Sequence, residues 1–281
     1  MFKHIAIGLD GSLHAAAAEE FGLALAARVG ASLRGVHVID VTFLEGAFIT
    51  DISGAMGFEP FLNLQAQTRS TLEELARLLQ ARFEEKCSAA GLAGEFQVER
   101  TSVVNGLLAT ARLADLFVVG QRGVNARLHE NMLGPVPGAL LRRSPIPVLV
   151  VPEGGALPRR PIVAYDGSPK AVRALHLAAE LCQVLALPLT VLTVDEDPER
   201  GRSRLAEATH YLSPFDLRVE TIHERGEAVE EIVLAHLEPG DLDLLCLGAH
   251  GHNRIVELVL GSTSEFLARR SPVAVLCATR P

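Results

Sequence analysis

Cysteine is scarce in this chain of 281 residues: there are four, and no two of them form a CxxC pair. Three of the four lie within apolar stretches that have helix or strand patterns. This distribution is typical of buried, reduced thiols and excludes a disulfide framework or a zinc site of the usual spacing. We therefore expect a cytoplasmic protein.

Basic runs and long apolar runs are also missing. The formal net charge is -8, and no cluster of Lys and Arg offers the surface that DNA or RNA phosphates require. No apolar stretch approaches about 18 residues, and residues 1–5 lead into a strand pattern without the apolar core of a signal peptide. We expect no nucleic-acid partner, no export and no membrane insertion.

The chain does contain an internal repeat. The motif Asp10-Gly11-Ser12 returns as Asp166-Gly167-Ser168, and residues 142–151 return as residues 269–278. Such a repeat indicates a tandem duplication, and the length prior of roughly 100–200 residues per domain agrees with two domains.

We place the two domains at residues 1–151 (the first copy) and 161–281 (the second copy), with a linker rich in Pro and Gly between them. Both alternate continuous apolar strand patterns with helical patterns, as in a parallel sheet covered on both faces. We predict an α/β fold of two tandem, doubly wound parallel sheets. The expected helices are residues 12–30, 68–90, 168–186, 203–212, 226–236 and 263–270, and the expected strands include residues 33–39, 95–101, 189–194, 217–223, 242–247 and 273–277.

The last strand of each copy, Val148–Val151 and Val273–Ala278, is apolar and would be an exposed edge if each copy stood alone. We expect these two strands to lie near each other across an internal two-fold, as they would in a dimer of identical subunits. The chain would then be a pseudo-dimer, with a further homodimer left open.

Residues 41–67 are an insertion, because the second copy has only a short segment at the equivalent place. The insertion contains four phenylalanines, so a solvated linker is a poor interpretation. The alternatives are a flap packed on its own domain, a dimer contact or a lid over a site. The four are Phe43, Phe48, Phe58 and Phe61.

The glycine spacing of the second copy carries the chemistry. Gly248-Ala-His-Gly251 follows the apolar run 242–247 directly, and nine residues separate Gly251 from Gly261-Ser262-Thr263. Glycines at a strand end and hydroxyls at a helix start let backbone N–H groups and side chains converge on an anion such as a phosphate. In a parallel sheet, Asp166, Val194 and these glycines would share the crevice at the carboxyl ends of the strands.

Together the Asp-Gly-Ser turn, the helix start at residues 226–232, this glycine spacing and the closing Arg-Ser-Pro-Val-Ala-Val-Leu segment resemble the universal stress protein family in tandem form. The resemblance covers the chain except residues 41–67. It implies the adenine-nucleotide alpha-hydrolase-like fold, with five strands in each sheet. It also implies a cytoplasmic stress-response role that acts through nucleotide-dependent conformation or partner binding. The glycine spacing separates family members that bind ATP from those that do not.

Carried over residue by residue, the resemblance implies an ATP site in the second copy. Asp166 would contact the ribose or the adenine, and the backbone of Val194 would contact the adenine. Mg²⁺ would accompany the triphosphate, held by phosphate oxygens and water. In the competing interpretation the glycines only make turns and Asp166 only caps its helix. The implied phosphate-binding residues are Gly248, Gly251, Gly261, Ser262 and Thr263.

The first copy departs from this pattern. Ten residues separate Gly123 from Gly134, where the second copy has nine between the equivalent glycines. Pro135, which has no N–H, stands where a residue with a hydroxyl is expected. The segment 106–115 is also eight residues shorter than its counterpart, the segment 226–243, so we expect a truncated helix in the first copy. Nucleotide binding in this copy is left open. The residues available for it are Asp10, Val38, Gly120, Gly123 and Gly134, with Arg122 and Arg127 as added charge.

His250 and His252 flank Gly251 and raise the alternatives of a metal ligand or a catalytic base. Neither has a ligand cluster at metal spacing, so we expect hydrogen-bond donors, with no catalytic residue and no protein-bound metal. Arg254 is either a phosphate neighbour or a solvated side chain.

Two other functions remain open. One is an enzyme that hydrolyses ATP or transfers an adenylyl group. This alternative has little support, because the sequence has no Walker, His-x-Gly-His or Ser-Gly-Gly motif. An interaction scaffold with vestigial sites fits the first copy better than the second. Nucleotide that co-purifies with the protein would separate these alternatives.

Overall fold

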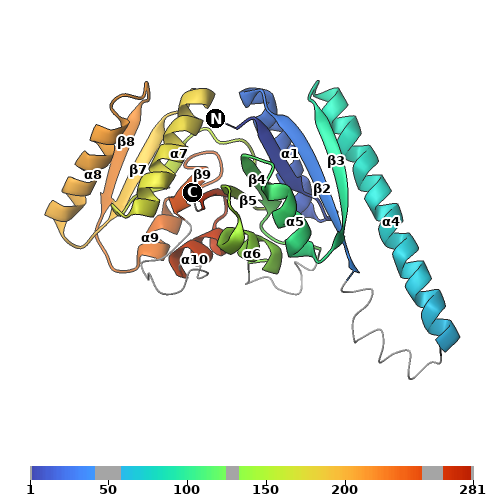
Figure 1. Cartoon of the computed structure of the whole chain (residues 1–281). Helices are drawn as coiled ribbons and strands as arrows, with labels where there is room; N and C mark the ends of the chain where they lie inside the picture. The colour runs from blue at the N-terminus through green and yellow to red at the C-terminus, as the bar shows by residue number, and fades with distance from the viewer. Residues whose placement is uncertain (1, 42–57, 125–132, 249–261, 280–281) are drawn as a thin grey trace.

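The computed structural model describes residues 2–41, 58–124, 133–248 and 262–279. Within them the strands form one continuous sheet of ten strands in the order β3-β2-β1-β4-β5-β10-β9-β6-β7-β8 (Figure 1). The first five strands of this order come from the first copy and the last five from the second. The predicted α/β class with doubly wound sheets is confirmed.

The elements of the first copy follow the predicted rhythm. Its strands are β1 (His4–Gly8), β2 (Ser32–Asp40), β3 (Gly94–Thr101), β4 (Leu116–Gly120) and β5 (Val148–Val151). Its helices are α1 (Leu13–Val29), α4 (Phe58–Ala89), α5 (Val103–Ala111) and α6 (Pro135–Arg143).

The second copy repeats this order. Its strands are β6 (Pro161–Ala164), β7 (Leu189–Val194), β8 (Val219–Glu224), β9 (Leu244–Gly248) and β10 (Ala274–Ala278). Its helices are α7 (Pro169–Leu185), α8 (Pro198–Leu212), α9 (Val229–Ala235) and α10 (Ser262–Arg270).

Serine caps set the start of the first helix in each copy. The Ser12 hydroxyl accepts a hydrogen bond from the Ala15 N–H at 3.1 Å, and the Ser168 hydroxyl accepts one from the Ala171 N–H at 3.2 Å. Each bond satisfies one of the N–H groups that the first turn of a helix leaves unpaired. The helix that Ser12 caps ends at Gly30, whose φ of 69° is left-handed, a conformation that glycine adopts without strain.

The two copies join through their last strands. β5 and β10 pair in antiparallel register, with Val150 opposite Val275 and Leu149 opposite Leu276, whereas every other pair in the sheet is parallel. The expected meeting of the closing strands is therefore confirmed. Each strand covers the apolar edge of the other, so the two halves become one sheet.

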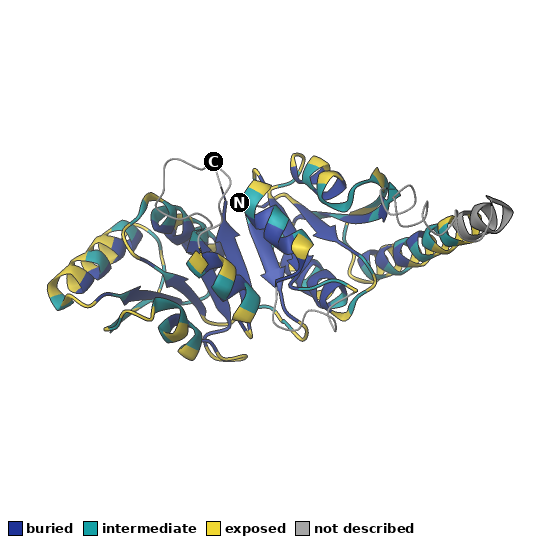
Figure 2. Ribbon diagram, turned by 90° about the horizontal axis from the view of Figure 1, so that it is seen from below, coloured by how far each residue is buried: buried dark blue, intermediate teal, exposed yellow. Residues whose placement is uncertain are grey.

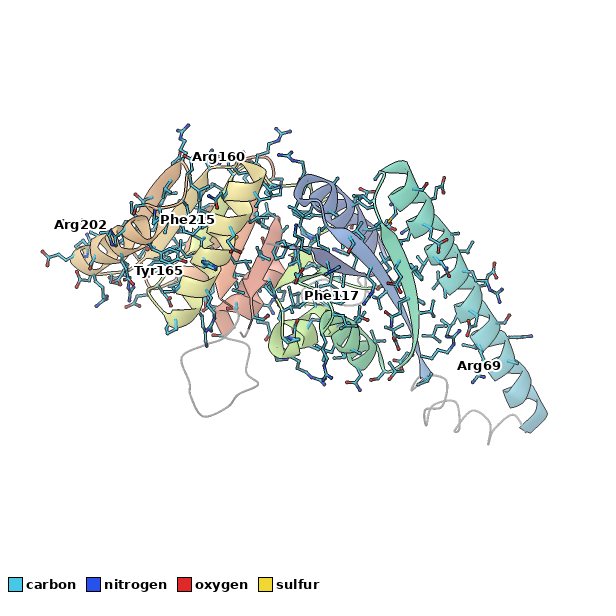
Figure 3. The ribbon with its side chains drawn as sticks, turned by 45° about the horizontal axis from the view of Figure 1, so that its top comes forward. Arg69, Phe117, Arg160, Tyr165, Arg202 and Phe215 are labelled. Atoms are coloured by element: carbon cyan, nitrogen blue, oxygen red, sulfur yellow. The ribbon has the colours of Figure 1, made fainter. Side chains whose placement is uncertain are left out.

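Helices cover both faces of this sheet, and each face has a core that runs through both copies. The side chains of α1, α4, α7 and α8 pack in one core, and those of α5, α6, α9 and α10 pack in the other. Figure 2 shows the buried strands between these layers. In Figure 3 the fully buried Phe117 lies near the centre, while Arg69 and Arg202 lie on outer helices at opposite ends of the molecule.

Glu19 is a fully buried carboxylate on the face that α1 presents to α4. Its Oε2 atom accepts hydrogen bonds from Arg82 Nη2 at 2.9 Å and Lys86 Nζ at 2.8 Å, both on α4. Within the described residues its other oxygen has no partner. The second copy has the buried Leu175 at the equivalent seventh position of α7. The ion cluster therefore attaches α4 to the first copy alone.

A buried amide links the copies on the opposite face. Gln121, the residue directly after β4, donates from Nε2 to the carbonyl oxygens of Ala268 at 2.9 Å and Ser271 at 3.1 Å. These carbonyls belong to the end of α10, where backbone acceptors lack partners within the helix. One side chain of the first copy thus caps a helix of the second.

We expect Gln121→Ala to lower the free energy of unfolding by about 1–3 kcal/mol, because buried carbonyls lose their donors. Urea unfolding followed by circular dichroism measures the change. The control is Gln80→Ala, which removes only the surface contact of Gln80 with Glu84 and should change stability by less than about 0.5 kcal/mol. Equal losses in the two variants would contradict a linking role for Gln121.

Two expectations for the first copy need comment. The helix expected to be truncated is not: α5 has nine residues and α9 has seven. The second copy is longer in the loops on both sides of this helix, between β8 and α9 and between α9 and β9, so the length difference was assigned to the wrong element. Of the insertion, residues 42–57 lie outside the described residues, and residues 58–67 extend α4, whose first turns project away from the sheet in Figure 1.

Candidate functional site

The candidate site lies at the carboxyl ends of the strands of the second copy. β6 lies between β9 and β7, so Asp166 after β6 is flanked by Gly248 at the end of β9 and Val194 at the end of β7. The chain runs from β6 to β7 on one side and returns as β9 on the other, which makes this edge a switch point of the kind that binds ligands. The structure therefore brings these three predicted residues to one edge.

Other predicted residues of this loop are not placed. Gly251, Gly261, His250, His252 and Arg254 lie outside the described residues. Their contacts to a ligand stay predictions.

Asp166 has a carboxylate with capacity for a ligand. Its Oδ1 atom accepts the Ser168 N–H at 2.9 Å, which shapes the turn into α7, and the residue is exposed. Among the described residues no further donor to Asp166 is seen. A carboxylate oxygen can accept two hydrogen bonds, so ribose hydroxyls or an amino group can be accommodated.

Gly248 is required by packing, whatever it binds. A Cβ atom at this position would lie 2.6 Å from Lys170 Cβ and 2.8 Å from its carbonyl carbon, in the first turn of α7. Gly120 meets the first turn of α1 in the same way, with a Cβ position 2.7 Å from the carbonyl carbon of His14. Both glycines let the start of a helix approach the end of a strand closely. This packing role agrees with the competing interpretation, in which the glycines serve the fold and not a ligand.

The start of α10 supplies hydroxyls beside this edge. Ser262 is exposed, Thr263 Oγ1 donates to Glu230 Oε1 at 2.5 Å, and Ser264 Oγ donates to the Gly248 carbonyl at 2.7 Å. The sequence interpretation included Ser262 and Thr263 but missed Ser264 and Glu230. Ser264 follows the motif directly and could have been found, whereas Glu230 comes from another helix.

The first copy lacks all three of these hydroxyls. α6 begins with Pro135-Val136-Pro137 at the positions where α10 begins with Ser262-Thr263-Ser264. The cap residue Gly134 has no side chain to offer, and its N–H is bonded to the Gln121 carbonyl at 3.2 Å. Two prolines also remove two backbone N–H groups. The loss of donors is larger than the motif alone indicated.

The carboxylate of Asp10, the counterpart of Asp166, is engaged by backbone N–H groups of two other residues. Its Oδ1 accepts the Ser12 N–H at 2.9 Å, and its Oδ2 accepts the Val124 N–H at 3.2 Å. Gly123 permits this closure, because a Cβ there would lie 2.8 Å from Asp10 Oδ2. Val38, near the end of β2 at the same edge, is half-buried. Arg127 lies outside the described residues. The first copy thus uses its carboxylate to hold a loop.

His14 adds no charge to the first copy's crevice. The imidazole is buried in the first turn of α1, and burial lowers the pKa of His14 below its ordinary value. The nearby Arg122 guanidinium lowers this pKa further, because it disfavours a second positive charge. The side chain is therefore neutral at pH 7, and Arg122 is the neighbouring cation.

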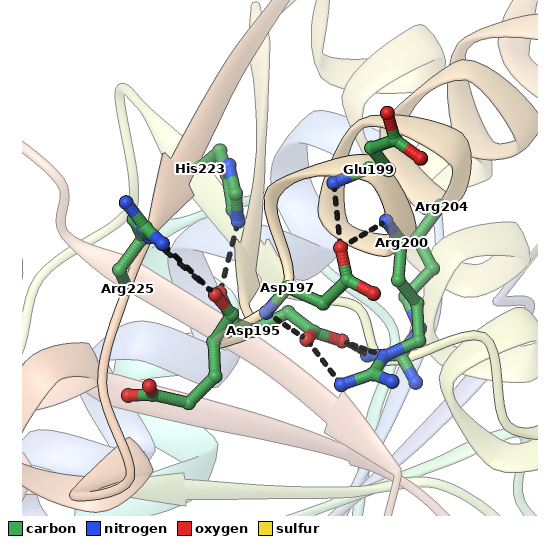
Figure 4. A network of polar contacts seen from close by, with 8 residues as sticks. Asp195, Asp197, Glu199, Arg200, Arg204, His223 and Arg225 are labelled. Atoms are coloured by element: carbon green, nitrogen blue, oxygen red, sulfur yellow. Dashed lines mark hydrogen bonds and ion pairs between the residues drawn. The ribbon is translucent and has the colours of Figure 1, made fainter.

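An ion cluster at the end of β7 was not predicted. Asp195 is buried, with hydrogen bonds from Arg200 Nε and Nη2 at 2.6 Å each, from Arg204 Nη1 at 2.5 Å and from the Asp197 N–H at 2.9 Å (Figure 4). The first copy has the apolar Ile39 at the equivalent position. An acid at a strand end followed by two arginines one helical turn apart is a signal that could have revealed the cluster.

These contacts hold the pKa of Asp195 at about 2, below the ordinary 3.8, mainly through the Arg200 hydrogen bonds. A lowered pKa means that the cluster contributes stability above about pH 4, which is lost as the pH falls toward 2. Arg204 also lies 3.7 Å from the position of a Cβ on Gly167, next to Asp166. Arg204 therefore packs against the turn that carries Asp166.

Among the residues that the structure describes, no group of three His, Cys, Asp or Glu side chains lies close enough together to hold a metal ion. All four cysteines are free and buried, as predicted. Burial raises the pKa of Cys182 to about 12 and that of Cys246 well above its ordinary value, so these thiols stay protonated.

In the described part of the chain no helix combines the length and apolarity needed to cross a membrane.

Comparison with known proteins matches the sequence to the model of the universal stress protein family at residues 1–152 and again at residues 159–279. The chain is similar to the universal stress protein Slr1230 of Synechocystis sp., with 27% identity over 98% of this chain and 99% of the relative. A universal stress protein of Mycolicibacterium smegmatis is 27% identical over 66% of this chain and 69% of that relative.

Among solved structures, the crystal structure of a universal stress protein from Archaeoglobus fulgidus has a TM-score of 0.74. The alignment covers 99% of this chain and 98% of that chain, with 23% sequence identity. This likeness concerns the fold, which is shared over the full length of both chains.

Proposed function

Because the chain belongs to the universal stress protein family, we propose that its second copy binds ATP and that the protein acts in a cytoplasmic stress response. The nucleotide would change the protein's conformation or its partner, without metabolic turnover. The two copies at residues 1–151 and 161–281 are the proposed domains.

One observation carries this proposal: Asp166 and the hydroxyl-bearing start of α10 flank Gly248 at one switch point of the sheet. The exposed Asp166 carboxylate suits a ribose, and the helix start with Ser262 suits phosphates. The residues present therefore fit an adenine nucleotide. Mg²⁺, when bound with ATP, would neutralise phosphate charge and be held mostly by phosphate oxygens and water.

We expect Asp166→Ala to weaken ATP binding by roughly 10–150-fold, because a hydrogen bond to a charged group is worth about 1.5–3 kcal/mol. Isothermal titration calorimetry measures the affinity. Asp10→Ala is the matched control, since it removes the same turn-forming carboxylate from the first copy and should leave the affinity within about twofold. Unchanged affinity in Asp166→Ala would remove this residue from the site.

The mass of any small molecule that co-purifies with the protein tests the function itself. Retained ATP supports a sensor, whereas ADP with released phosphate supports hydrolysis. The scaffold alternative has a specific observation in its favour only in the first copy, where Asp10 is engaged by two backbone N–H groups. A protein that neither retains ATP nor binds it on titration would extend the scaffold interpretation to the second copy.

A further inference from the structure

Glu230 contacts Thr263, one of the residues predicted to bind phosphates. It is the second residue of α9, and its Oε1 atom accepts a hydrogen bond of 2.5 Å from the hydroxyl of Thr263, the second residue of α10. The first turns of two helices thus meet through one acid and one hydroxyl. Both side chains are half-buried, so the carboxylate is only partly hydrated.

This contact places a carboxylate directly beside a residue predicted to bind phosphates, where a triphosphate would favour positive charge or donors. Unit charges about 4 Å apart interact by about 1 kcal/mol in bulk water and about 4 kcal/mol near a protein surface, and here the sign is repulsive. The Thr263 hydroxyl is also engaged already and cannot donate to Glu230 and a phosphate at once. ATP without a cation therefore meets a site that opposes it.

The first copy shows that the acid and the hydroxyl are lost together. α6 has Val136 where α10 has Thr263, and α5 has no acidic residue in its first turn. α9 has two in its first turn, Glu230 and Glu231. The pair is thus confined to the copy whose other residues fit a nucleotide.

We propose, on the premise that the second copy binds ATP, that Glu230 makes this binding depend on a divalent cation. A hard cation such as Mg²⁺ is commonly held by one or two carboxylates together with phosphate oxygens. With the cation present, the Glu230 carboxylate would be attracted to it and would favour binding. Without the cation, the same carboxylate repels the phosphates.

The test compares ATP affinity with and without Mg²⁺, by calorimetry, in the full-length protein and in Glu230→Gln. We expect the variant to bind cation-free ATP about ten- to hundredfold more tightly than the wild type, because one repulsive charge is gone. The gain in affinity that Mg²⁺ produces should fall by a similar factor. Glu231→Gln is the matched control: it removes the adjacent charge in the same turn, and Glu231 is exposed.

Thr263→Val provides a second measurement that leaves the carboxylate in place. The dependence on Mg²⁺ should persist in this variant, because Glu230 keeps its charge. An unchanged Mg²⁺ dependence in Glu230→Gln, with ATP still bound, would overturn the inference and leave the proposed function intact. No ATP binding by the wild type in either condition would overturn both.

Discussion

Replacement of Arg82 and Lys86 together by methionine is expected to lower the free energy of unfolding by about 3–5 kcal/mol. The two cations are the partners of the Glu19 carboxylate, which has no exposed surface of its own. Methionine keeps the length of both side chains and the helix propensity of α4 but leaves a buried charge without compensation. Chemical denaturation followed by circular dichroism measures the loss.

The control uses the other half of the molecule. Glu19→Leu copies Leu175 of the second copy, and in the double-methionine background it should restore most of the lost stability, because a packed apolar side chain replaces a buried ion cluster at little cost. Alone, it should cost much less than the double variant, because the Arg82 and Lys86 side chains are 41% and 31% exposed and can turn to water. No rescue by leucine would show that the cations act through other contacts.

One ATP per chain is the expected stoichiometry. The first copy lacks at least two donors at its phosphate loop, and at about 1.5–3 kcal/mol each this costs about 3–6 kcal/mol, enough to turn micromolar binding into millimolar or weaker. The engaged Asp10 adds to the difference. Titration calorimetry gives the stoichiometry directly.

The reciprocal change is a sharper form of this experiment. Ser262→Pro with Thr263→Val gives the second copy the residues of the first and should weaken ATP binding by roughly 10²–10⁴-fold. Pro135→Ala in the first copy is the control, since it restores an N–H but no hydroxyl and should leave one site per chain. Two sites of equal affinity in the wild type would show that the departures in the first copy are tolerated.

Local signals were sufficient to predict most of the fold. Ser12 and Ser168 each precede a helical pattern, and the structure has both as caps. The closing strands could be paired in advance, because an apolar edge must be covered and the repeat supplies an equivalent edge. The helix wrongly expected to be short shows the limit, since a length difference alone does not indicate which element carries it.

Long-range contacts between side chains were beyond this reasoning. Glu19 stands among alanines in a helical pattern, and nothing nearby indicates that its partners lie on a helix more than 60 residues later. The site was accessible only in part for the same reason. Its glycines and hydroxyl residues recur at a fixed spacing within one short stretch of sequence, whereas Glu230 reaches Thr263 from a different helix.

The antiparallel pairing of β5 with β10 gives a symmetric assembly made from one chain. When two identical chains pair about a two-fold axis, every substitution occurs twice, and a residue that helps one subunit but harms the other cannot be kept. Here Glu19 faces α4 in one copy while Leu175 packs in the other, and Gln121 caps a helix across the axis. Selection can therefore act on each half separately, so that a change in one half need not be repeated in the other.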